Sequence, residues 1–188
     1  DDLTFRPYRR FGAGGAKIIW GEATAVVEEG RANARQLLIN DYTASSLEHM
    51  LRDCRAAHRE QFGLHDDLVV GLQLTHSGRY SFQRPLIAFH DPLLDPRTVV
   101  DKSRGLTVTP DYPILDDDYL QRLVDLYVAA ARLVFRIGFD FVDIKQCHRY
   151  LLSELLAAKT RPGRYGGDFE NRTRFVRNVI GKIRNAVP

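Results

Sequence analysis

Three side chains with complementary chemistry, Lys145, His148 and Tyr150, fall between positions 145 and 150. They follow an apolar, strand-like stretch that runs from Phe139 to Ile144. A lysine at the end of a buried strand needs an anion, a polarisable carbonyl or water for its ammonium group. His148 can donate hydrogen bonds to a developing negative oxygen, and Tyr150 can act as a general acid if a neighbouring charge tunes it. We therefore treat these three residues as the candidate catalytic group.

Cys147 lies inside this group and has two interpretations. It could be a reactive thiol, but a cysteine in this setting is more often a small packed hydrophobic residue. His148 has no second histidine or carboxylate at ligand spacing, so the sequence predicts no metal site. The two cysteines, Cys54 and Cys147, are far apart in the sequence, and a reduced, cytoplasmic setting is the simpler interpretation.

Two earlier apolar stretches, residues 16–24 and 68–74, also end in polar groups. The second ends at Gln73, whose amide can donate and accept at once and could bind a flat heterocycle with carbonyl and imide edges. His76 and Arg79 follow it. For His76 a structural hydrogen bond to backbone is at least as good an explanation as catalysis, and for Arg79 we favour a structural role.

The stretches between these strands have helical spacing, with expected helices at 44–62, 116–137, 151–157 and 168–186, and the end of another at 3–13. Alternation of helices and strands is typical of parallel βαβ units, so the predicted fold class is α/β. The carboxyl ends of parallel strands meet on one side of a sheet, where ligands bind. Residues 80–115 are rich in proline, and we expect an irregular functional loop or lid there.

The bulk composition fits one globular domain over residues 1–188, with 44% hydrophobic and 27% charged residues. A net charge of +3 with dispersed arginines gives little support for nucleic-acid binding. No apolar stretch reaches the ~18 residues that a membrane span needs.

Four blocks of sequence together resemble the old yellow enzyme family of flavin-dependent NADH:flavin oxidoreductases and ene-reductases. The blocks are Glu22-Ala23-Thr24-Ala25-Val26-x-x-Glu29-Gly30-Arg31, Gly71-x-Gln73-Leu74-x-His76-x-Gly78-Arg79, Gly138-Phe139-Asp140-x-Val142-Asp143-Ile144-x-x-x-His148-x-Tyr150-Leu151-Leu152 and Tyr165-Gly166-Gly167-x-Phe169-Glu170-Asn171-Arg172-x-Arg174-Phe175. They occur in the family's order and cover nearly the whole chain.

The resemblance implies a TIM barrel that carries FMN at the carboxyl ends of its strands. Ala23 and Thr24 would then contact the flavin, Ala23 through its backbone, and Gln73 would bind the pyrimidine edge of the ring. His148 would hold the activating oxygen of a small unsaturated carbonyl substrate, and Tyr150 would protonate its alkene carbon. Hydride would come from flavin N5, with NADH or NADPH reducing the flavin again.

Two positions depart from the family pattern. The family usually has His where this chain has Lys145, which would place a fixed cation beside the flavin and could stabilise an anionic ring or an enolate-like oxygen. Arg149 stands where Gly is usual and adds bulk and charge at the strand exit. Ordinary enones are therefore not assumed to be substrates.

The resemblance also suggests an incomplete barrel, containing the second to fourth strands and their helices. The strands that would hold the flavin phosphate fall outside this sequence, so we expect weak or absent FMN binding unless the chain assembles with another copy or with the remaining half. Two alternatives stay open. The chain could be a non-catalytic half-barrel scaffold, or part of an amine dehydrogenase or enoate reductase built on the same barrel.

Overall fold

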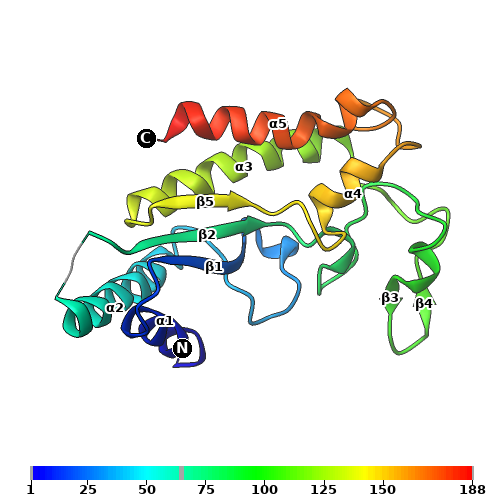
Figure 1. Cartoon of the computed structure of the whole chain (residues 1–188). Coiled ribbons are helices and arrows are strands. Elements are labelled where there is room, and N and C mark those ends of the chain that lie inside the picture. The colour runs from blue at the N-terminus through cyan, green and yellow to red at the C-terminus, as the bar shows by residue number, and fades with distance from the viewer. Residues whose placement is uncertain (1, 64–65, 188) are drawn as a thin grey trace.

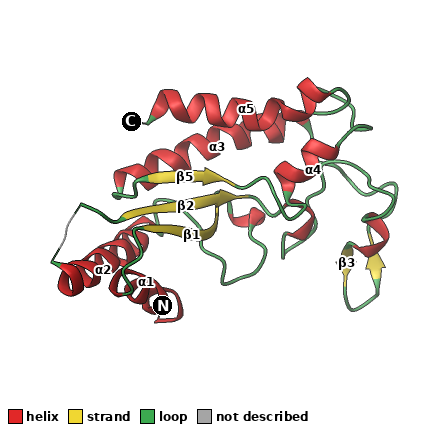
Figure 2. Cartoon of the chain, in the orientation of Figure 1, coloured by secondary structure: helices red, strands yellow, loops and turns green. Residues whose placement is uncertain are grey.

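The structure, a computed structural model, describes residues 2–63 and 66–187 (Figure 1). Three strands, β1, β2 and β5, form the main sheet, and the described residues also form five α-helices (Figure 2). The helices are α1 (Asp2–Ala13), α2 (Ala44–Phe62), α3 (Asp117–Arg136), α4 (Leu151–Ala157) and α5 (Phe169–Ala186). The strands are β1 (Ile18–Ala25), β2 (Val69–Thr75), β3 (Val99–Asp101), β4 (Leu106–Thr107) and β5 (Phe141–Ile144).

The main sheet is entirely parallel, in the order β1-β2-β5. Helix α2 connects β1 to β2, and α3 lies between β2 and β5 along the chain. Each helix returns the chain to the start of the next strand, because parallel neighbours require a crossover. The predicted α/β class and the predicted order of parallel units are confirmed.

One face of the sheet packs against helices and forms the core. Val70, Leu72 and Leu74 of β2 are fully buried, as are Val124 and Tyr127 of α3. These β2 residues alternate along the strand and therefore point to the same face. Figure 1 shows α3 and α5 running side by side along the sheet, and α1 and α2 packed together near β1.

The opposite face of the sheet is uncovered within the described residues. It presents Ile18, Trp20 and Val69, whose exposed fractions are 63%, 62% and 39%. Large apolar side chains at such exposure form the kind of patch that is normally covered in a folded protein. This face corresponds to the interior of a barrel that three strands do not close.

Local sequence explains where the helices begin and end. Gly63 ends α2 in the left-handed conformation with φ 68°, which glycine adopts without strain. Asp116 and Asp168 begin α3 and α5, and each carboxylate accepts a hydrogen bond from a backbone N–H three residues on. Pro7 lies inside α1, which nevertheless continues to Ala13, with Tyr8 buried in the core.

The expectation that residues 80–115 contain no regular structure is wrong. Strands β3 and β4 pair antiparallel there, in the small hairpin that Figure 1 shows away from the main sheet. Asp101 accepts hydrogen bonds from Ser103 and from the Arg104 backbone N–H, and Gly105 supplies a φ of 64°. Such carboxylate-stabilised turns let two very short strands meet between prolines.

Candidate active site

The sheet register aligns the predicted residues of neighbouring strands. Ala23 of β1 lies opposite Gln73 of β2, and Gln73 lies opposite Asp143 of β5. The register shifts between Trp20 and Ala23, so two residues of β1 stand opposite one residue of β2, and a Cβ at Gly21 would come within 2.4 Å of the Gly71 carbonyl oxygen. This irregularity precedes the alignment of Ala23 with Gln73.

Gln73, Asp143 and Trp20 form one hydrogen-bonded cluster on the uncovered face. Gln73 Nε2 donates to Asp143 Oδ2 at 2.6 Å, and Trp20 Nε1 donates to the same oxygen at 3.2 Å. The Trp20 ring also meets Phe141 edge-on, with centroids 5.1 Å apart. The amide predicted to contact a cofactor is therefore already held by a carboxylate.

Lys145 and Tyr150 come together just beyond β5. The Lys145 side chain is buried, and its Nζ atom lies 4.7 Å from the centroid of the Tyr150 ring. This is a cation–π contact. Within residues 2–63 and 66–187 the structure shows no hydrogen bond from this ammonium group, so the cation remains able to bind an anion or a polarised oxygen.

His148 joins this pair from an exposed turn. Its ring lies 6.1 Å from that of Tyr150, at an interplanar angle of 84°. His148 and Arg149 both have positive φ, 59° and 56°, which is strained for residues other than glycine. The turn closes with a hydrogen bond from Tyr150 N to Cys147 O, and Cys147 itself is exposed. The left-handed backbone conformation of His148 and Arg149 thus brings the His148 and Tyr150 rings next to each other.

Ala23 and Thr24 are placed differently from one another. Ala23 is half-buried and its carbonyl accepts a hydrogen bond from Gln36 Nε2 at 3.0 Å. Thr24 is fully buried, and its hydroxyl donates to the Glu22 carbonyl. The Thr24 side chain is thus engaged locally, and its contact with a cofactor stays a prediction.

His76 and Arg79 have structural surroundings, as the sequence suggested for them. His76 Nδ1 accepts from Gly78 N, which leaves its Nε2–H to donate to the Tyr119 hydroxyl at 2.9 Å. Burial lowers the pKa of His76 to about 3. Tyr119 in turn donates to Glu29. His76 is therefore a neutral, buried link between the end of β2 and the first turn of α3.

Arg79 is the centre of a buried ionic cluster. Its guanidinium contacts Asp95 at 2.6 Å and Glu154 at 2.7 Å, and donates to the Phe89 carbonyl at 3.0 Å. Burial acts to lower the pKa of Arg79, but the two carboxylates outweigh it and leave that pKa raised. The cluster joins the end of β2, the residue 80–115 segment and α4, the helix that follows Tyr150.

Sequence reasoning missed Asp143, Trp20 and Glu154. For Asp143 a signal existed, because it is an acidic residue in the middle of an apolar strand and shares a strand face with Lys145. Glu154 carried no local signal, since its partner Arg79 is 75 residues away.

The candidate site does not lie in the large cavity that the described residues form. This cavity, of about 790 Å³, lies between α1, α2 and the segment from Arg31 to Thr43, and neither Lys145 nor Tyr150 lines it. Among residues 2–63 and 66–187, no helix combines the length and apolar character that a membrane span requires.

Parallel strands joined by helices, with polar side chains at their carboxyl ends, are the arrangement found in (β/α)-barrel proteins. Residues 6–188 match the family described as the NADH:flavin oxidoreductase / NADH oxidase family. The chain belongs to this family, in agreement with the resemblance to old yellow enzyme.

Individual relatives agree with this assignment. The chain is 29% identical to the NADH:flavin oxidoreductase FG08077 of Gibberella zeae, over 89% of this chain and 41% of that protein. It is 30% identical to an NADPH dehydrogenase of Geobacillus sp., over 95% of this chain and 47% of that protein. The chain thus spans about half the length of the curated relatives it matches.

Solved structures show the same fold. Old Yellow Enzyme from Pichia sp. AKU4542 matches with a TM-score of 0.79 at 20% identity, over 99% of this chain and 48% of that one. Morphinone reductase in a complex with tetrahydroNAD matches with a TM-score of 0.75 at 25% identity, over 95% of this chain and 50% of that one. The described chain therefore has the architecture of an incomplete barrel.

Proposed function

We propose that this chain carries the substrate-side face of an FMN-dependent NAD(P)H oxidoreductase that reduces an activated C=C bond in a small unsaturated carbonyl compound. The observation that supports it best is the meeting of Lys145, His148 and Tyr150 beside Gln73, at the ends of adjacent parallel strands. A cation, two hydrogen-bond donors and an amide at one edge suit a carbonyl substrate stacked on a flat heterocycle.

The residues present fit a flavin ring. Gln73 offers an acceptor and a remaining N–H to an imide edge, and the Lys145 ammonium offers positive charge to an electron-rich ring or oxygen. Ala23 lies beside Gln73 in the register, where its backbone would meet the ring. When bound, FMN supplies hydride from its N5 position, drawn from NADH or NADPH.

The side chains of this chain would bind and protonate the substrate. His148 would donate a hydrogen bond to the substrate carbonyl oxygen and so draw electrons from the alkene. The Tyr150 hydroxyl would then donate the proton to the alkene carbon. Lys145, held 4.7 Å from the Tyr150 ring, would favour the negative charge that develops nearby. Its fixed charge distinguishes this site from one with a neutral imidazole at that position.

The experiment uses the single tryptophan of the chain. Trp20 lies on the proposed face, so a bound flavin should quench its emission by energy transfer. Purified chain is analysed by gel filtration, titrated with FMN, and assayed for NADPH oxidation with added FMN and a panel of small unsaturated carbonyl compounds. We expect weak binding and substrate-dependent oxidation that Tyr150→Phe lowers about 100-fold. Saturating FMN without Trp20 quenching would contradict the proposed face.

A scaffold role is the second candidate, and the uncovered apolar face with Ile18 and Trp20 favours it. A scaffold would form a complex through that face and show no NADPH oxidation with added FMN. The fold also matches histamine dehydrogenase, with a TM-score of 0.74 at 23% identity. The same assay is therefore also run with an amine as the substrate to be oxidised.

A further inference from the structure

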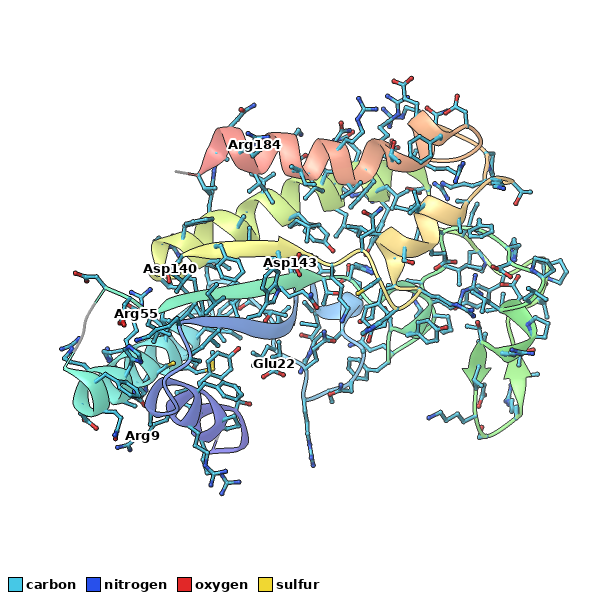
Figure 3. The ribbon with its side chains drawn as sticks, in the orientation of Figure 1. Arg9, Glu22, Arg55, Asp140, Asp143 and Arg184 are labelled. Carbon is cyan, nitrogen blue, oxygen red and sulfur yellow. The ribbon has the colours of Figure 1, made fainter. Side chains whose placement is uncertain are left out.

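Asp143 lies in the middle of the candidate face but has no part in the chemistry proposed above. Its Oδ2 atom accepts hydrogen bonds from Gln73 at 2.6 Å and from Trp20 at 3.2 Å. The three residues come from β5, β2 and β1, so these bonds cross the whole sheet. Figure 3 labels Asp143 at β5, with β2 and β1 next to it.

The carboxylate determines which way the Gln73 amide points. An ionised carboxylate is an acceptor only, so the amide nitrogen must face Asp143 and the amide oxygen must face away. A flipped amide would lose this bond and would bring Gln73 Oε1 next to Asp143 Oδ2. Both oxygens are acceptors, so they would repel each other. Gln73 therefore has one preferred orientation before any ligand arrives.

Asp143 is itself held in place. The Trp20 indole N–H is its second donor, and the Trp20 ring packs edge-on against Phe141. Phe141 lies over Gly71, where a Cβ would come within 2.3 Å of the Phe141 ring. The packing that fixes Phe141 and Trp20 thus also limits the movement of Asp143.

With its orientation fixed, the Gln73 amide presents Oε1 and its second Nε2–H on the side away from Asp143. This pair is complementary to an N–H group next to a carbonyl, which is the imide edge of an isoalloxazine ring. We propose that Asp143 is a positioning residue that acts through Gln73 and makes this face select a ligand with a free imide N–H. The inference rests on the proposed function of the face as a flavin site.

The first test needs no flavin. In the ligand-free chain, the side-chain amide protons of Gln73 are compared by NMR with those of Gln83, which is exposed. We expect a Gln73 proton shifted downfield by the carboxylate, and a return toward the Gln83 position in Asp143→Ala. Gln73 protons that already match Gln83 in the unmodified chain would overturn the positioning role, whatever the chain binds.

The second test uses lumiflavin and 3-methyllumiflavin, which differ only in the imide N–H. By energy transfer from Trp20, we expect the chain to bind lumiflavin at least 10-fold more tightly, and Asp143→Ala to reduce this preference below 3-fold. Gln73→Leu should abolish the preference. Asp125→Ala should keep it, because Asp125 pairs with Lys182 on an exposed surface. If Asp143→Ala does not fold, Asp143→Asn replaces it, since an amide there tolerates either orientation of Gln73.

The outcomes separate the two proposals. Lumiflavin binding with a preference that survives both Asp143 variants overturns the positioning role and leaves the flavin face intact. Binding without any preference in the unmodified chain also overturns the positioning role alone. No binding of lumiflavin, with the Gln73 amide shown to be locked, overturns the flavin face and the selection of an imide N–H, and leaves the positioning of Gln73 by Asp143 standing.

Discussion

The ammonium group of Lys145 lies 4.7 Å from the ring centroid of Tyr150, and Lys145 is only 7% exposed. The side chain is largely buried while its ammonium group still reaches solvent, so the charge is only partly desolvated, and an aromatic face compensates for that in part. Lys145 is therefore placed where a charge useful for ligand binding lowers the stability of the free chain by a small amount. Sites of this kind are where stability and activity conflict.

Replacing Lys145 by Met should separate these two effects. The variant loses a cation–π contact but no longer carries a partly desolvated charge at the end of a buried side chain, so we expect the free energy of unfolding to rise by up to about 1 kcal/mol. Urea denaturation measures it. Lys159→Met, at an exposed position, is the matched control and should change stability by less than about 0.5 kcal/mol. A destabilised Lys145→Met would show that the ammonium has a compensating partner.

Arg149 has a φ of 56°, in the region that favours glycine. For a residue with a Cβ this conformation costs roughly 1–2 kcal/mol, while glycine loses somewhat more backbone entropy on folding. We therefore expect Arg149→Gly to stabilise the chain by about 0.5–1 kcal/mol. Arg149→Ala keeps the strain and should have little effect. Equal melting temperatures for the Gly and Ala variants would contradict this account.

Much of the fold could be predicted from the sequence, because its signals are local. Apolar runs next to glycines identified β1 and β2, and helical spacing from residue 44 to 62 matched α2. The β3–β4 hairpin was missed because strands of three and two residues carry no periodicity to recognise. The pairing of these strands depends on a turn that Asp101 stabilises through hydrogen bonds, and such bonds cannot be read from the composition of the segment.

The site was predictable only as a set of strand ends. Lys145 and Tyr150 could be grouped because they are neighbours in the chain, and Gln73 because parallel strands end together. The bond from Gln73 to Asp143 depends on a register that the sequence does not contain. The Arg79–Glu154 pair likewise depends on how α4 docks against the end of β2.

That buried pair gives a third prediction. The side chains of Arg79 and Glu154 are 0% and 1% exposed, so removing Arg79 leaves the Glu154 carboxyl buried without its cation, either charged or protonated at a cost. We expect Arg79→Met to lower the free energy of unfolding by about 3–5 kcal/mol. Arg79→Met combined with Glu154→Leu should recover a large part of that loss. A double variant no more stable than Arg79→Met alone would show that the remaining partner, Asp95, carries the cost.

His76 predicts how stability depends on pH. Its pKa is about 3 in the folded chain, lowered by burial from an ordinary value of 6.5. Between these values the unfolded chain takes up a proton that the folded chain does not, so stability should fall as pH decreases from 6.5, by at most about 1.4 kcal/mol per pH unit.

Carboxylates with lowered pKa values, such as Asp67 and Asp117, lose their contribution only at lower pH. Glu154, whose pKa burial raises to about 7, acts in the opposite direction over the same range, because there the folded chain takes up a proton that the unfolded chain does not. The contribution of His76 is therefore the difference between the urea midpoints of the unmodified chain and of His76→Gln, measured from pH 7 to pH 4.5. This difference should grow as pH falls, and parallel profiles for the two chains would assign the dependence to another group.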